Sequence, residues 1–143
     1  MATQVGKQAP SIRTNATIDG SVFDIKDLKG KYIIIDFWGT WCGACIAGMP
    51  EMQAFRNKHK DKVDILGIAK DRSIDVWRSF VKEKKMDWPN VFNGTDDENY
   101  VELFSVQGYP TKVLIDLNGK IAFRMTGERK EFYEEVERII NAN

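Results

Sequence analysis

The stretch YIIIDFW (Tyr32–Trp38) is the strongest structural signal in this sequence of 143 residues. Its side chains are apolar on both alternations of a strand, and the one exception is Asp36. A strand that is apolar on both faces is typical of the centre of a sheet that is covered on both sides. The stretch therefore predicts an α/β fold built around this strand.

Helical and strand patterns alternate on the C-terminal side of this stretch. The predicted helices span 43–59, 73–85, 96–104 and 129–141, the predicted strands span 63–69, 111–116 and 121–125, and 88–92 is a short extended piece. Pro50 lies about two turns into the first helix, where a missing N–H predicts a kink. Asn118-Gly119 joins the last two strands and is a strong hairpin signal.

Residues 1–30 are expected to form an N-terminal hairpin extension that turns at Asp19-Gly20. Helical crossovers give parallel pairing and the Asn-Gly hairpin gives antiparallel pairing, so the sheet should be mixed. The prediction is a single domain over residues 1–143, a three-layer α/β sandwich with helices on both faces of the sheet.

The composition limits the function classes. Hydrophobic residues make up 43% of the chain, charged residues 29%, and 21 Lys and Arg balance 21 Asp and Glu. Without a basic excess there is no electrostatic reason to expect nucleic acid as a partner. No run of 18 apolar residues occurs, so we expect no spanning membrane segment. As a separate expectation, the protein is a monomer.

The compartment depends on the origin of Met1. Residues 1–30 contain no basic segment followed by an apolar one, so they do not have the pattern of a signal peptide. If Met1 is native, the protein is expected in the cytoplasm. If a signal or anchor has been removed, an extracytoplasmic location, periplasmic or membrane-anchored, is expected.

The two cysteines lie in the sequence Trp41-Cys42-Gly43-Ala44-Cys45, where a loop enters a predicted helix. The free N–H groups and the positive end of a helix favour the thiolate form of Cys42, which is the nucleophilic form. Cys45 follows one turn later on the same side and should be shielded from solvent. We therefore expect Cys42 to attack a disulfide and Cys45 to resolve the mixed disulfide.

Three other interpretations of the cysteine pair are weaker. A tetrahedral zinc site needs four ligands, and His59 is the only further soft ligand, so no metal is expected. Haem attachment needs His directly after Cys45, where this chain has Ile46. A purely structural disulfide would close a very small ring and remove little entropy from the unfolded chain.

Asp36 is the third candidate catalytic residue. It interrupts an apolar strand six positions before Cys42, where a lone buried carboxylate is costly. A carboxyl beneath the pair would accept the proton of Cys45 when that thiol attacks. The alternative is that Asp36 lies at a frayed strand end and is bonded to backbone or water.

Pro110 precedes the strand at 111–116 and cannot donate a hydrogen bond to a neighbouring strand, so it should begin that strand or lie in a special turn. Because only ~5% of X-Pro bonds are cis, the residues alone predict a trans Pro110.

Several motifs in the sequence together resemble a known superfamily. The resemblance rests on four motifs in the same order and spacing: Asp36-Phe37-Trp38, Trp41-Cys42-Gly43-Ala44-Cys45, Pro50 and Tyr109-Pro110-Thr111. These motifs resemble the thioredoxin superfamily. The N-terminal motifs Gly6-Lys7-Gln8-Ala9-Pro10, Asp19-Gly20 and Asp27–Lys31 resemble more specifically the bacterial TlpA/ResA-type thiol-disulfide oxidoreductases, which are related to the AhpC/TSA proteins.

The resemblance implies further properties. It implies a cis Pro110 that faces the Cys42 sulfur, with the Tyr109 backbone offered to a substrate chain. It also implies an extracytoplasmic location and a role in keeping selected disulfides reduced. The substrate-binding residues expected on this basis are Trp41, Gly43, Ala44, Tyr109 and Pro110.

Three positions depart from the family pattern. The TlpA/ResA-type family often has Asn at the position of Asp36, whereas thioredoxin itself has Asp there, as this chain does. Many relatives carry a Glu after the second strand, where this chain offers Asp71, either as an auxiliary acid or as a surface loop charge. The dipeptide Gly43-Ala44 replaces the usual Gly-Pro or Pro-Pro, so the family's redox potential is not carried over.

The expected function is thiol-disulfide exchange on protein disulfides, in the reducing direction, without a bound cofactor. With only two cysteines in the chain, electrons must come from an upstream donor. One alternative is a thiol peroxidase, because Ala9-Pro10 also occurs in peroxiredoxin-like relatives, although Thr40 is one place late for their Thr-x-x-Cys motif. The other is a non-catalytic thioredoxin-fold binding module.

Overall fold

The computed structural model describes residues 4–28 and 30–142. Its main sheet has the strand order β5-β4-β3-β6-β7. The strands are β3 (Tyr32–Trp38), β4 (Val63–Ala69), β5 (Asn90–Phe92), β6 (Thr111–Ile115) and β7 (Ile121–Thr126). β3 and β4 and then β4 and β5 pair in parallel, whereas β3 and β6 and then β6 and β7 pair antiparallel. The predicted mixed sheet with an Asn-Gly hairpin is confirmed.

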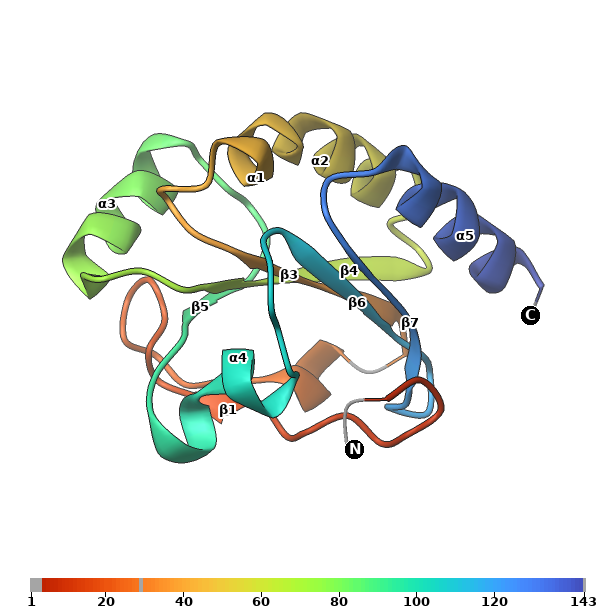
Figure 1. Ribbon diagram of the computed structural model, residues 1–143, viewed down its shortest axis with the longest axis horizontal. Coiled ribbons are helices and arrows are strands. Elements are labelled where there is room, and N and C mark those ends of the chain that lie inside the picture. The colour runs from red at the N-terminus through yellow and green to blue at the C-terminus, as the bar shows by residue number, and fades with distance from the viewer. Residues whose placement is uncertain (1–3, 29, 143) are drawn as a thin grey trace.

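The N-terminal hairpin is also present. β1 (Arg13–Thr14) and β2 (Phe23–Asp24) pair antiparallel, and a 3₁₀ helix, η1 (Ile25–Leu28), follows. Figure 1 shows this extension beneath the main sheet. Residues 1–3 and Lys29 of the predicted extension lie outside the described residues, and so does Asn143 at the end of the predicted domain.

β3 lies at the centre of the sheet, and none of its seven residues is exposed. Because side chains alternate along a strand, Ile34 and Trp38 enter one core, and Ile35 and Phe37 enter a second core on the other face. Asp36 points to the same face as Ile34 and Trp38. The core on that face also contains both cysteines.

Helices cover the two faces of the sheet unequally (Figure 1). The cysteine face carries α1 (Gly43–Ala47), α2 (Met49–Lys58), α3 (Ile74–Glu83) and α5 (Lys130–Asn141). The other face carries η1, the hairpin and the short helix α4 (Tyr100–Leu103). The three-layer arrangement predicted from the sequence is therefore confirmed.

The predicted interruption of the first helix near Pro50 is confirmed, and it takes the form of a break at Gly48, two residues before the proline. The N–H of Gly48 still donates to the Ala44 carbonyl, 3.1 Å away, and α2 begins at the next residue. A proline ring clashes with the carbonyl four residues earlier, here that of Ile46, so a continuous helix cannot include Pro50. Pro50 instead lies in the first turn of α2, where its missing N–H costs nothing.

The helix predicted over 96–104 is two separate elements. A 3₁₀ turn, η2 (Asp96–Glu98), precedes α4, and Asn99 lies between them. The Asn99 side chain accepts a hydrogen bond from the Glu102 N–H, 3.3 Å away, and so begins a new helix. The piece at 88–92 is extended as predicted, and its residues Asn90–Phe92 form the edge strand β5.

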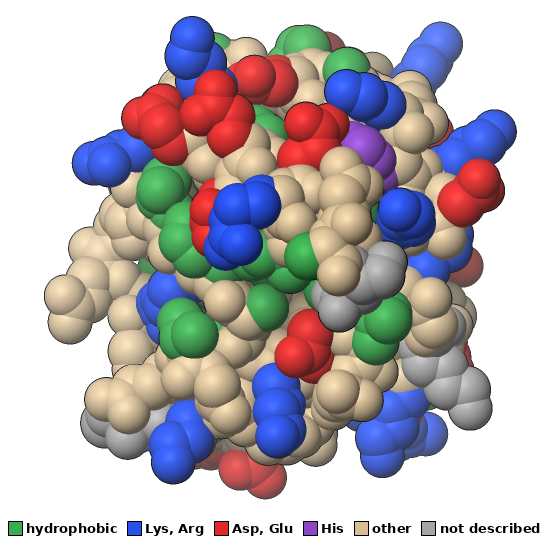
Figure 2. Space-filling model, turned by 90° about the vertical axis from the view of Figure 1, so that its right-hand side faces the viewer, with side chains coloured by type: hydrophobic (Ala, Val, Ile, Leu, Met, Phe, Trp, Pro, Cys, Tyr) green, Lys and Arg blue, Asp and Glu red, His purple; other side chains and the backbone are tan. Residues whose placement is uncertain are grey.

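Figure 2 shows the face of the molecule at the end of β3 away from the cysteines. Lysine and arginine side chains are interspersed there with aspartate and glutamate, and neither sign dominates this face. Within residues 4–28 and 30–142, no helix is both long and apolar enough to cross a bilayer.

Gly67 in β4 provides a test of how tightly the cysteine face is packed. A Cβ at Gly67 would lie 3.1 Å from the Trp38 indole nitrogen and would overlap the Asn90 side chain, which itself accepts a hydrogen bond from that indole. Gly67→Ala should therefore lower the free energy of unfolding by about 1–3 kcal/mol in urea denaturation. Gly43→Ala is the matched control, since its Cβ would meet nothing within 4 Å. Equal stability of both variants would contradict this packing.

Candidate active site

Cys42 and Cys45 are joined by a disulfide at the start of α1, with Cα atoms 5.3 Å apart. Cys42 is the N-cap residue, and the Cys45 N–H donates to its sulfur over 3.2 Å. Such a donor, together with the helix N-terminus, favours a thiolate once the disulfide is reduced. Cys45 is 3% exposed and therefore shielded from solvent as expected, and Cys42, at 7%, is also buried in this oxidised state.

Trp41 is the exposed neighbour of Cys42, with 58% of its surface accessible. Its indole N–H donates to the Lys70 carbonyl over 2.7 Å, and its ring meets the edge of Tyr109 at 5.1 Å between centroids. Gly39 makes this position possible, because a Cβ there would overlap the indole and approach the Lys70 carbonyl to 2.8 Å. The importance of Gly39 was missed in the sequence, where it looked like an ordinary loop glycine.

The Tyr109–Pro110 bond is cis. The trans bond predicted from base rates is therefore wrong, and the cis bond implied by the family resemblance is confirmed. The ring contact between Trp41 and Tyr109 places this segment beside the cysteine loop. Of the expected substrate-binding residues, Trp41, Gly43 and Ala44 are exposed, Tyr109 is half-buried and Pro110 is buried.

Asp36 is the fifth residue of β3 and is 1% exposed, so the alternative of a frayed strand end is wrong. One carboxylate oxygen, Oδ1, is buried without a hydrogen-bond partner. Burial raises the pKa of Asp36 to about 6; Lys112 opposes this rise and Glu128 adds to it. An acid with this pKa exchanges its proton near neutral pH, as a catalytic carboxyl must.

Lys112 and Glu128 are charged residues of this region that the sequence analysis did not find. Lys112 pairs with Asp36 in the β3–β6 register and is itself 3% exposed. Its ammonium lies 3.7 Å from Asp36 Oδ1 and 2.7 Å from Glu128 Oε1. The available signal was that Asp36 and Lys112 are the only charged residues in two adjacent apolar strands.

Asp71 follows β4 and holds the loop that precedes Cys42. Its carboxylate accepts the Thr40 backbone N–H at 3.2 Å and the Thr40 hydroxyl at 2.7 Å. These hydrogen bonds distinguish Asp71 from a free surface charge and tie it to the loop that precedes Cys42.

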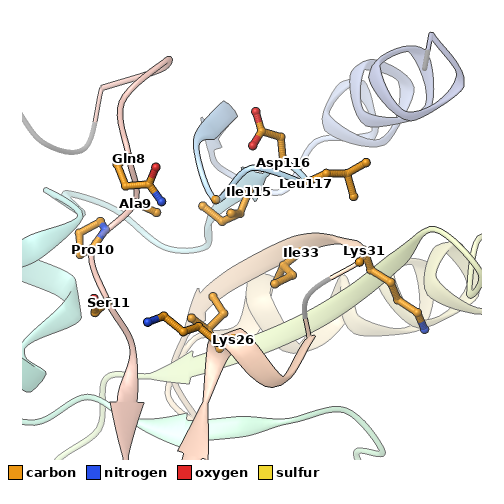
Figure 3. Close-up of a pocket in the computed structure, with 13 residues that line it drawn as sticks. Gln8, Ala9, Pro10, Ser11, Lys26, Lys31, Ile33, Ile115, Asp116 and Leu117 are labelled. Carbon is orange, nitrogen blue, oxygen red and sulfur yellow. The ribbon is translucent and has the colours of Figure 1, made fainter.

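A separate pocket of about 160 Å³ lies at the other end of β3 (Figure 3). Its lining includes Gln8, Ala9, Ile33, Ile115, Asp116 and Leu117. No cysteine lines this pocket, so it does not belong to the disulfide site. In the part of the chain that the structure describes, no group of three or more His, Cys, Asp or Glu residues is arranged to hold a metal ion.

Comparisons with known proteins agree with this site. The family model described as Redoxin matches residues 4–140. A thiol-disulfide oxidoreductase ResA of Bacillus cereus is 35% identical over 128 residues, which cover 88% of this chain and 72% of that protein. ResA of Bacillus subtilis (strain 168) is 29% identical over 127 residues, which cover 88% of this chain and 69% of that protein.

Solved structures lead to the same group. The thioredoxin domain of a thiol-disulfide oxidoreductase from Bacteroides vulgatus superposes with a TM-score of 0.83 at 29% identity, covering 96% of this chain and 98% of that one. A thiol:disulfide interchange protein from Bacteroides sp. gives a TM-score of 0.83 at 30% identity, covering 99% and 93%. The chain therefore belongs to the redoxin family, as a ResA-like thiol-disulfide oxidoreductase with the thioredoxin fold.

Proposed function

We propose that this protein reduces disulfide bonds in other proteins, with the Cys42–Cys45 dithiol as the electron source. The observation that carries the proposal is the disulfide at the start of α1, in which the Cys42 sulfur accepts the Cys45 N–H beside the exposed Trp41. The reducing direction is supported by the resemblance to TlpA/ResA-type proteins.

The reaction has two exchange steps. The Cys42 thiolate attacks one sulfur of the substrate disulfide, forms a mixed disulfide and releases the first substrate thiolate, which takes up a proton. Cys45 then loses its proton and attacks the Cys42 sulfur, which releases the second substrate thiol. Two electrons pass from the protein to the substrate, and the Cys42–Cys45 disulfide forms.

Asp36 is the proposed acceptor of the Cys45 proton. It lies on the same face of the sheet as the core that holds Cys45, and its pKa of about 6 allows it to be ionised at neutral pH. Asp71 is proposed as the auxiliary acid that acts through Thr40.

Substrate binding is proposed for the surface around Cys42. Its residues are Trp41, Gly43, Ala44, Tyr109 and Pro110. Exposed backbone and aromatic rings suit an extended peptide of varied sequence, because the backbone is common to all peptides.

The proposed partners are protein thiols and disulfides and an upstream electron donor. An external donor is needed because the chain has only two cysteines, and both are used in the exchange. We propose a single domain that acts as a monomer at an extracytoplasmic site, in keeping with the family resemblance.

Cysteine variants test the order of attack. In insulin reduction with dithiothreitol, Cys42→Ser should lower the rate of turbidity increase to that of dithiothreitol alone, because the attacking thiol is removed and the remaining thiol, Cys45, is buried. Cys45→Ser should instead accumulate mixed disulfides through Cys42, detected as substrate adducts by mass spectrometry. Wild-type activity of Cys42→Ser, or rapid peroxide consumption at Cys42 with no insulin reduction, would contradict the proposal.

The pH dependence of the second exchange step tests the role of Asp36. Reaction of the reduced protein with an aromatic disulfide releases one coloured thiolate in each step. The second release should slow as the pH is lowered through about 6, because protonated Asp36 cannot accept a proton. Asp36→Asn should lack this transition and be about 100-fold slower at pH 7. Asp116→Asn, at the far end of β6, is the control, and an Asp36→Asn profile identical to wild type would refute the role.

Asp36 should also make stability depend on pH. Between pH 4 and 6 the unfolded chain releases the Asp36 proton while the folded protein retains it, so folding becomes less favourable as the pH rises. Compared with Asp36→Asn, the oxidised wild-type protein should therefore lose up to about 3 kcal/mol of unfolding free energy over this range and none above it. Urea denaturation at pH 4–8 measures this difference, and a constant difference would show that Asp36 is not desolvated.

A further inference from the structure

Glu128 approaches the active site from a loop that is remote in sequence. It lies between β7 and α5, and its side chain is 20% exposed, whereas the side chains of Lys112 and Asp36 are 4% and 2% exposed. Glu128 therefore links a fully buried pair of charges to the molecular surface. Its Oε1 binds the Lys112 ammonium at 2.7 Å, which is a short charge-assisted hydrogen bond.

Gly48 provides the space for the Glu128 carboxylate. A Cβ at position 48 would overlap the carboxylate carbon and both of its oxygens. Gly48 follows Cys45 by three residues and is the C-cap of α1. The Glu128 carboxylate thus packs against the backbone at the end of the helix that contains Cys45.

The balance of charges in this cluster favours the binding of one proton. Lys112 contributes one positive charge against the two carboxyl groups of Asp36 and Glu128. Among the described residues, four buried polar atoms have no hydrogen-bond partner, and three of them lie here: Asp36 Oδ1, Glu128 Oε2 and Tyr133 Oη. Two unpaired carboxylate oxygens in a buried site favour binding of a proton by one of them.

The distances show which carboxylate holds the lysine. Lys112 is within hydrogen-bond range of Glu128, but its 3.7 Å separation from Asp36 is too long for a hydrogen bond. If Glu128 were absent, Lys112 would be free to bind Asp36 directly and would stabilise its ionised form. A carboxylate stabilised in this way is a weaker proton acceptor.

We infer that Glu128 and Lys112 are positioning residues of this active site: Glu128 holds Lys112 away from Asp36 and thereby keeps Asp36 basic enough to take the Cys45 proton, and Gly48 leaves the space that this requires. The inference rests on the proposed function of Asp36. The other titratable groups around the cluster are the two cysteines at the start of α1, Tyr133 on α5 and Glu51 on α2. The negative charge of Glu51 helps to raise the pKa of Tyr133.

The test is the titration of Asp36 in the reduced protein, followed by the ¹³C shift of its carboxyl carbon. Glu128→Gln should lower the Asp36 midpoint by about one pH unit, and Lys112→Met should raise it by a similar amount. Gly48→Ala should lower it less than Glu128→Gln does, because it displaces the carboxylate without removing its charge. Glu137→Gln, an exposed carboxylate on α5 paired with Lys58, is the matched control and should change nothing.

A double variant makes the test specific. If Gly48 acts only through Glu128, then Gly48→Ala should have no further effect on the midpoint in a Glu128→Gln background. This comparison remains informative if Lys112→Met fails to fold. Folded Glu128→Gln and Gly48→Ala proteins that both titrate like wild type would overturn the inference. The role of Asp36 itself would then still stand or fall on the Asp36→Asn rate profile.

Discussion

β3 pairs along its length with β4 on one side, and most of it pairs with β6 on the other, while its side chains fill two separate cores. This double burial determines where the chemistry occurs. The strand ends at Trp38, and the loop that follows brings Cys42 to the start of α1, beyond the C-terminal end of β3. The antiparallel register of β3 and β6 places Pro110 at the same end of the sheet, because β6 begins where β3 ends. Burial at the same time makes Asp36 costly to ionise, which is what makes it useful as a proton acceptor.

Much of this arrangement was predictable from local patterns. The two buried strands have the expected bounds, and Asn118-Gly119 makes the expected hairpin, because apolar runs and turn residues are determined by nearby sequence. An interruption of the first helix near Pro50 was predicted from the proline itself, but its position at Gly48 was not. The cis form of Pro110 followed only from the family resemblance, since base rates favour trans.

The charged cluster around Asp36 was not predictable in the same way. Lys112 and Glu128 are far from Asp36 in sequence, and their meeting depends on strand register and on the loop before α5. The sequence also gives no sign that Gly48 matters, because its role is to lack a Cβ where the Glu128 carboxylate lies. In this protein the reactive pair can be found from a short motif, whereas the groups that set its proton chemistry become visible only when the sheet is assembled.

The central claim of this account is that the dithiol at Cys42 and Cys45 donates electrons to protein disulfides. The most direct test is the reduction potential of that couple, measured by equilibration with a reference thiol-disulfide couple of known potential. A value of about −270 mV, that of thioredoxin, is predicted for a reductase. A value near about −120 mV, that of the strong oxidant DsbA, would contradict the claim and indicate that the protein introduces disulfides instead.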